Sequence, residues 1–108
     1  MANFDEILQD LKDNALDLIK STLLDFKDQA TEDVNEFLNS SKDKLERWAT
    51  GLAKGELTKE DFKWLLESQK DLLVMNGLKQ AGLAKIQIDK FKNAIINMVV
   101  DTVVDKVL

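Results

Sequence analysis

Apolar residues recur in steps of three and four along the first half of this chain, from Phe4 to Leu52. The steps average about 3.7 residues, which is close to the turn of an α-helix and longer than the 3.5-residue repeat of a left-handed coiled coil. This segment is therefore predicted to form a long amphipathic helix over about residues 3–50. The stripe consists of Phe4, Leu8, Leu11, Ala15, Leu18, Thr22, Phe26, Ala30, Val34, Phe37, Ser41, Leu45, Trp48 and Leu52.

A single helix of this length is difficult to place in a chain of 108 residues. It would be about 70 Å long at ~1.5 Å per residue, whereas a compact domain of this size has a radius of gyration of only about 13 Å. Either the helix breaks near Thr31 or near residues 39–41, where new N-caps are available, or it stays long and a second copy covers it. We favour the long, self-associating helix because neither break point contains glycine or proline.

A glycine-containing segment marks the end of this first helical stretch. Gly51 and Gly55 offer the left-handed conformation that ends helices. Thr58 then follows as an N-cap, and Asp61 completes a capping-box pattern. A second helix is therefore expected over residues 59–76.

A third helix is expected over residues 83–107, where isoleucine and valine widen the apolar face past half of the circumference. So wide a face needs more than one partner helix. The same residues raise the strand propensity over residues 97–104, but the length of the segment and its lack of turn signals favour helix. The chain, residues 1–108, is predicted to be a single all-α domain: a small bundle of three to four helices with a long amphipathic N-terminal helix.

The sequence contains neither histidine nor cysteine. This excludes nucleophiles activated by histidine and metal sites built on thiolates or imidazoles. We therefore predict no catalytic, cofactor-binding or metal-ligating residue, and no enzymatic activity. Three pairs of carboxylates are interpreted as first-turn or solvent-facing charges: Glu32 with Asp33, Glu60 with Asp61, and Glu67 with Asp71.

The net charge of −5 repels nucleic-acid phosphates, and Arg47 is the only arginine, so no nucleic-acid partner is expected. Residues 1–50 hold 6 basic and 12 acidic side chains, whereas residues 51–108 hold 9 and 8, so the two halves can attract each other within one chain or between two. No segment approaches the ~20 apolar residues of a transmembrane helix. Acidic residues near the start oppose a secretory signal, and a cytoplasmic protein is expected.

The back of the second helix carries three candidate partner-contact residues, Trp64, Met75 and Leu78. At ~100° per residue they point away from the main apolar stripe of that helix. Either this helix is central and packs on both sides, or the second patch contacts another copy or a partner, because tryptophan and methionine are enriched at interfaces. Polar residues also lie along the apolar faces, namely Gln69 and Asn76 in the second helix and Thr102 and Lys106 in the third. Such residues can fix the register between helices, be partly exposed, or bind a ligand, and register or partial exposure is favoured over ligand binding.

These features favour a non-enzymatic structural or protein-interaction protein that forms a homo-oligomer and binds a protein partner. Support comes from the missing catalytic side chains and from apolar stripes too wide for so short a chain. The alternative is an amphipathic protein that opens its helices onto a lipid or other apolar surface, because the period of residues 4–52 resembles that of apolipoprotein-like helices. The acidic polar face argues against membrane-surface binding, since interfacial helices usually carry lysine and arginine.

Overall fold

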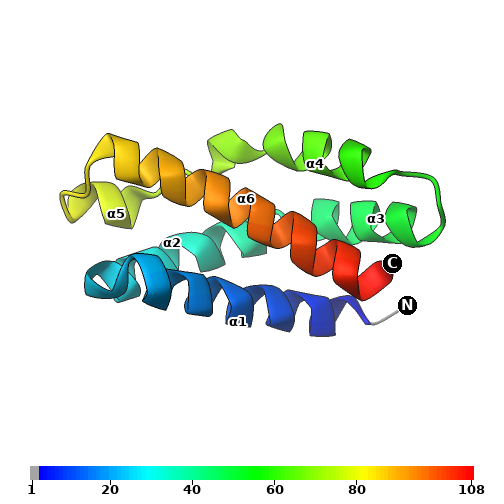
Figure 1. The fold of residues 1–108 in the computed structure, drawn as a ribbon, viewed down its shortest axis with the longest axis horizontal. Helices are drawn as coiled ribbons and strands as arrows, with labels where there is room; N and C mark the ends of the chain where they lie inside the picture. The colour runs from blue at the N-terminus through cyan, green and yellow to red at the C-terminus, as the bar shows by residue number, and fades with distance from the viewer. Residues whose placement is uncertain (1–2) are drawn as a thin grey trace.

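The computed structural model describes residues 3–108, and within this range the chain is helical with no strand (Figure 1). The all-α fold class is confirmed. The expected three to four helices are replaced by six shorter α-helices and two 3-10 helices in the described range. The elements are α1 (Phe4–Thr22), η1 (Leu24–Phe26), α2 (Lys27–Ser40), α3 (Lys42–Ala53), α4 (Lys59–Glu67), η2 (Lys70–Leu72), α5 (Asn76–Gln80) and α6 (Lys85–Val107).

The prediction of one long N-terminal helix is wrong, because the chain reverses direction between α1 and α2 (Figure 1). The Ser21 and Thr22 hydroxyl groups both donate hydrogen bonds to the Leu18 carbonyl oxygen, at 3.0 and 2.7 Å. Side-chain bonds of this kind compete with the backbone bonds of a helix and bend it. The break expected near Thr31 is also wrong, since Thr31 lies inside α2.

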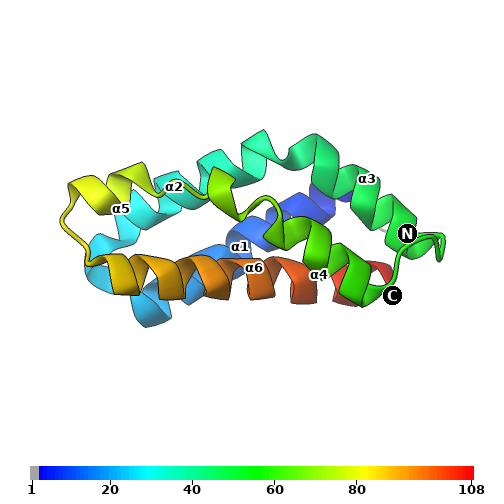
Figure 2. The same ribbon diagram turned by 90° about the horizontal axis from the view of Figure 1, so that it is seen from above.

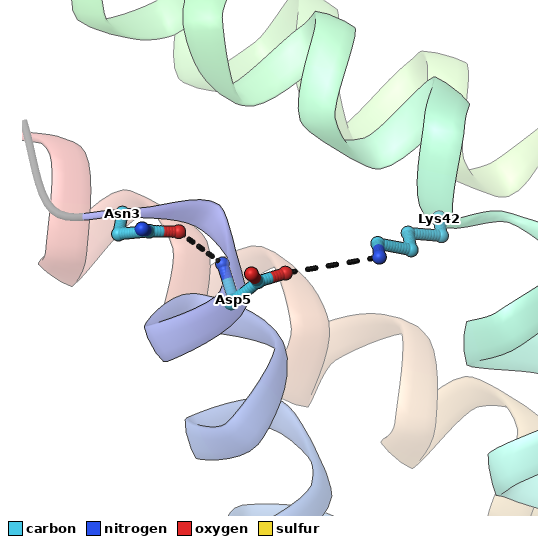
Figure 3. Close-up of polar contacts among 3 residues, drawn as sticks. All are labelled: Asn3, Asp5 and Lys42. Atoms are coloured by element: carbon cyan, nitrogen blue, oxygen red, sulfur yellow. Dashed lines mark hydrogen bonds and ion pairs between the residues drawn. The ribbon is translucent and has the colours of Figure 1, made fainter.

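A smaller change of direction separates α2 from α3 at Ser41, which is one of the two break points expected from the sequence. The start of α1 lies beside this corner. Asp5, whose backbone N–H donates to the Asn3 side-chain oxygen at 2.8 Å, forms an ion pair with Lys42 at 3.7 Å (Figure 3). The N-terminal half thus folds back on itself, and the longest dimension of the molecule is 42 Å.

The turn between α3 and α4 agrees with the sequence-based prediction. α3 ends at Ala53, and Gly55 has a φ of +77°, which glycine adopts without the steric cost that a Cβ atom brings. The Asp61 N–H donates to the Thr58 hydroxyl oxygen, and the Thr58 N–H donates to the Asp61 carboxylate, both at 3.1 Å. These reciprocal bonds confirm the predicted capping box at the start of α4.

The expected extent of the second helix, residues 59–76, is wrong at its C-terminal end. α4 stops at Glu67, where the Ser68 hydroxyl donates to the Leu65 carbonyl oxygen. The chain then passes through η2 and through Met75, which has a left-handed φ of 57°, before it enters α5. The side chains of α5 therefore do not continue the helical periodicity of α4, and their directions cannot be derived from it.

The last helix, α6, packs against α1, α3, α4 and α5. In Figure 1 it crosses between α4 and α1, and Figure 2 shows α2 and α3 along one long side of the molecule and α6 along the other. The strand alternative for residues 97–104 is wrong, because the whole segment is helical. Several helices of the same chain cover the wide face of α6, whose buried residues are Ile88, Phe91, Ile95, Ile96, Val99, Val100, Thr102 and Val103.

Asp33 on α2 is a buried carboxylate that joins distant parts of the chain. Its side chain is bonded through Oδ1 to the Gly77 N–H and through Oδ2 to the Leu78 N–H, both at 2.9 Å. These amides lie in the first turn of α5, where helix N–H groups need outside partners and negative charge is favourable. A Cβ atom at Gly77 would approach the carboxylate to 3.0 Å, so glycine provides the space that this cap needs. The interpretation of Asp33 as a first-turn or solvent-facing charge is therefore wrong.

Replacing this cap is expected to destabilise the fold. Asp33→Ala should lower the free energy of unfolding by about 2 to 3 kcal/mol, because the buried Leu78 N–H loses its acceptor. Urea unfolding followed by circular dichroism measures the change. Glu32→Ala, at the exposed neighbouring position, is the matched control and should change stability by less than about 0.5 kcal/mol. Equal losses in the two variants would show that the cap contributes nothing.

Candidate functional site

Trp64 lies on the solvent-facing side of α4. Phe62 and Leu66 on the same helix are fully buried, and Trp64 lies on the opposite side from them at ~100° per residue. The Trp64 side chain is 70% exposed, and it is the one aromatic among the exposed large hydrophobic residues of the described range. The predicted outward orientation of Trp64 is confirmed.

The inner side of α4 is fixed in the bundle. The Phe62 ring meets the Trp48 ring of α3 edge to face, with 6.5 Å between the ring centroids and 71° between the planes. Just beyond α4, the Lys70 Nζ donates to the Asn93 Oδ1 of α6 at 2.5 Å. One side of α4 is buried, whereas Trp64 on the other side is exposed in the described chain, so the indole is not packed within this fold.

Charged and polar side chains surround the Trp64 indole on the helix surface. Glu60 and Ser68 lie four residues before and after it and Glu67 lies three residues after it, so these exposed residues are its neighbours on the helix surface. An exposed aromatic group within a polar rim is the composition found at the centres of protein interfaces. The acidic side chains of the rim would favour a partner that brings basic groups.

Met75 and Leu78, the other two candidate contact residues, do not lie with Trp64 on the surface. Met75 is 2% exposed and Leu78 is 0% exposed, and both belong to the hydrophobic core. The sequence-based prediction assumed one helix through residue 76, whereas α4 ends at Glu67. The intervening turns rotate the later residues inward, so the expected three-residue patch is reduced to Trp64.

Several other acidic side chains of the described range lie in helix caps or along an open surface hollow. Within residues 3–108, no cluster of three or more acidic side chains is arranged to hold a metal ion. A broad, open hollow beside α2 is lined largely by exposed polar side chains, among them Asp28, Glu32 and Glu36. The Asp33 and Asp61 carboxylates accept hydrogen bonds in helix caps. Asp33 and Asp61 are therefore used in helix caps, whereas Asp28, Glu32 and Glu36 line an open surface hollow.

Two polar contacts join α1 to α6. The Asn14 Nδ2 donates to the Thr102 Oγ1 at 2.9 Å, and Lys106 forms an ion pair with Asp10 at 2.7 Å. The hydrogen bond and the charge of Asp10 raise the pKa of Lys106 above its usual value. Both contacts link α1 to α6 at defined positions along the two helices.

A scan against known protein families, a search of curated proteins and a search of solved structures each returned no match for this chain. Among residues 3–108, no helix combines the length and the apolar character needed to cross a bilayer.

Truncation of Trp64 should leave the fold nearly unchanged. Because its side chain is mostly in water, Trp64→Ala should alter the free energy of unfolding by about 0.5 kcal/mol or less. Phe62→Ala on the buried side of the same helix should cost about 3 to 5 kcal/mol. Chemical unfolding of both variants tests this difference. If Trp64→Ala lowered the free energy of unfolding as much as Phe62→Ala does, the indole would be part of the core.

The Asp10–Lys106 ion pair between α1 and α6 predicts how the stability of the fold depends on pH. Asp10→Asn should lower the pKa of Lys106 towards the ordinary lysine value, which NMR titration of the Lys106 Nζ signal can measure. A raised lysine pKa stabilises the fold fully below the ordinary pKa, and this stabilisation disappears as the pH rises through the raised value. The stabilities of the parent chain and Asp10→Asn should therefore converge at strongly alkaline pH. Asp17→Asn, an exposed substitution on α1, should leave the Lys106 pKa unchanged.

Proposed function

We propose that this chain is a non-enzymatic helical protein that binds other proteins and self-associates, in both cases through the outer face of α4 around Trp64. The observation that carries the proposal is the 70% exposure of Trp64 on a helix whose opposite side is fixed in the core. Leaving an indole in water forgoes the favourable free energy of its burial. A partner that covers the indole would recover this free energy, and tryptophans in such positions often dominate binding.

The non-enzymatic part of the proposal is supported by the available side chains. The chain has no histidine or cysteine, which are the residues most used for proton transfer near neutral pH and for thiolate chemistry. Among the carboxylates, Asp33 accepts hydrogen bonds from the Gly77 and Leu78 N–H groups, and Asp61 accepts one from the Thr58 N–H, which are structural uses. A role in binding requires none of the missing groups.

The fold leaves less exposed apolar surface to support self-association than the sequence predicted. The long first stripe and the wide α6 face, which favoured it, are largely covered inside one chain. The outer face of α4 is then the surface that supports it, because a two-fold pairing of this face would bring two indoles and their rims together. The exposed area is modest, which favours a reversible dimer over a permanent one.

Light scattering at increasing protein concentration tests the self-association. The parent chain should show a mass that rises above that of a monomer, and Trp64→Ala should restore the monomer. Leu72→Ala, which truncates an exposed aliphatic side chain outside α4, is the control and should behave as the parent. A strictly monomeric parent at high micromolar concentration would reject self-association.

Binding to other proteins needs a separate experiment. The parent chain and Trp64→Ala, each immobilised, are exposed to extract of the native cell, and the retained proteins are compared. Retention that depends on Trp64 supports the proposed surface. Identical retention by both variants would show that the outer face of α4 is not the binding site.

A further inference from the structure

Two segments that are distant in the sequence meet at one end of the bundle. The turn between α1 and α2 and the start of α6 lie at the same end in both views (Figures 1 and 2). A hollow of about 230 Å³ between them is lined by Leu23, Gln87 and Phe91, among others. We call residues 20–28 and 79–90 the lysine-rich end.

Two large aliphatic side chains of this end are in water. Leu24, beside Leu23, is 62% exposed, and Ile86, beside Gln87, is 67% exposed. Apart from the last residue of the chain, only Trp64 exceeds them among the exposed large hydrophobics of the described range. Most large hydrophobic side chains of the described range are buried, and packing within the bundle does not cover Leu24 or Ile86.

The charge of this end is opposite to that of the rest of the molecule. The lysine-rich end holds five lysines and three aspartates, net +2, whereas the rest of the chain holds 10 basic and 17 acidic residues, net −7. Its lysines are all exposed, and in residues 3–108 the recorded ion pairs involve none of them. They are Lys20, Lys27, Lys79, Lys85 and Lys90.

We propose that the lysine-rich end docks the closed bundle onto an anionic lipid bilayer. Leu24 and Ile86 enter the boundary between headgroups and acyl chains, while the surrounding lysines contact lipid phosphates and carboxylates. Apolar insertion and electrostatic attraction together are the two contributions that hold peripheral proteins on membranes. This inference is independent of the face of α4, which lies on a different side of the molecule.

The shape of the end favours a bilayer over a protein partner. The molecule measures 23 by 20 Å across its long axis, so its tip offers less area than the roughly 800 Å² per partner of a standard protein interface. A bilayer does not need a matching surface, because lipids rearrange around two inserted side chains. Nucleic acid is disfavoured, since the rest of the molecule is strongly acidic and aliphatic side chains gain nothing from phosphates.

This docking differs from the opening of helices onto a lipid surface. The core side chains of α1, α2 and α6 stay packed on each other, because Leu24 and Ile86 are already exposed in the closed bundle. The bundle would then stand on its end, with the outer face of α4 still in water.

Vesicle flotation with the full chain tests the inference. Vesicles of phosphatidylcholine containing phosphatidylserine should bind the protein, vesicles of phosphatidylcholine alone should not, and added salt should release it. Lys85→Gln and Lys90→Gln should each weaken binding about five-fold. Leu24→Ser combined with Ile86→Ser should weaken it about ten-fold or more. All four positions are exposed, so the variants should keep the circular dichroism spectrum of the parent chain.

Lys54→Gln combined with Lys59→Gln is the matched control, because it removes two exposed lysines around the α3–α4 turn. That turn is at the opposite end of a molecule 42 Å long, and screening at such a distance should hold the change within about two-fold. Trp64→Ala should bind vesicles as the parent does. The tryptophan emission of the parent chain should not shift when it binds vesicles.

Several results would overturn the proposal. These are equal binding to neutral and anionic vesicles, a loss for the Lys54→Gln/Lys59→Gln control as large as that for Lys85→Gln or Lys90→Gln, and a blue shift of tryptophan emission that reports opened helices. Absence of vesicle binding would also overturn it, and binding to polyglutamate without vesicle binding would instead assign the end to an acidic protein.

Discussion

The wide apolar face of α6 is the constraint on which the rest of the fold depends. A helix whose isoleucine and valine residues cover more than half of its circumference cannot be buried by one neighbour. In this chain four helices supply the cover, namely α1, α3, α4 and α5. The N-terminal half can reach α6 at both α1 and α3 only if it turns back on itself, so the reversal between α1 and α2 follows from the same requirement. The Asp10–Lys106 and Asn14–Thr102 contacts then fix α1 along α6.

Much of the core could be predicted from periodicity, and the turns could not. The first stripe correctly contains core residues on both sides of the reversal, from Phe4 to Ala15 and from Ala30 to Leu45. At the reversal itself the stripe includes Thr22, which is exposed. The signal there is Ser21 followed by Thr22, whose hydroxyl groups bond back to the helix, and this pair is much weaker than a glycine or a proline.

In the candidate site, too, some positions could be predicted from the sequence and others could not. The outward orientation of Trp64 follows from the phase of a short helix with a strong N-cap, so it could be predicted. The burial of Met75 and Leu78 depends on where α4 ends and on the cap from Asp33, which lies 44 and 45 residues from the amides that it binds. No local pattern in the sequence contains this contact. The lysine-rich end likewise could not be predicted from the sequence, because it forms only when residues 20–28 and 79–90 come together in the fold.

The chain forms a closed bundle that buries most of its apolar stripes, and two of its exposed surfaces are the outer face of α4 and the lysine-rich end. They lie on different parts of the molecule, so a membrane and a protein partner would not compete (Figure 1). The sequence suggested that apolar surface is abundant and drives assembly. In the folded chain it is scarce, and the few exposed side chains define the places where binding is proposed.

The central claim is that the N-terminal half folds back within one chain, and one distance tests it most directly. The chain has no cysteine, so spin labels can be attached at Asp5→Cys and Lys42→Cys alone, and the distance between them measured by pulsed electron paramagnetic resonance. The two native side chains are 3.7 Å apart, so a short distance is expected that persists when labelled protein is diluted with unlabelled protein. A separation near the ~55 Å of a continuous helix, or a short distance that disappears on dilution, would contradict the account.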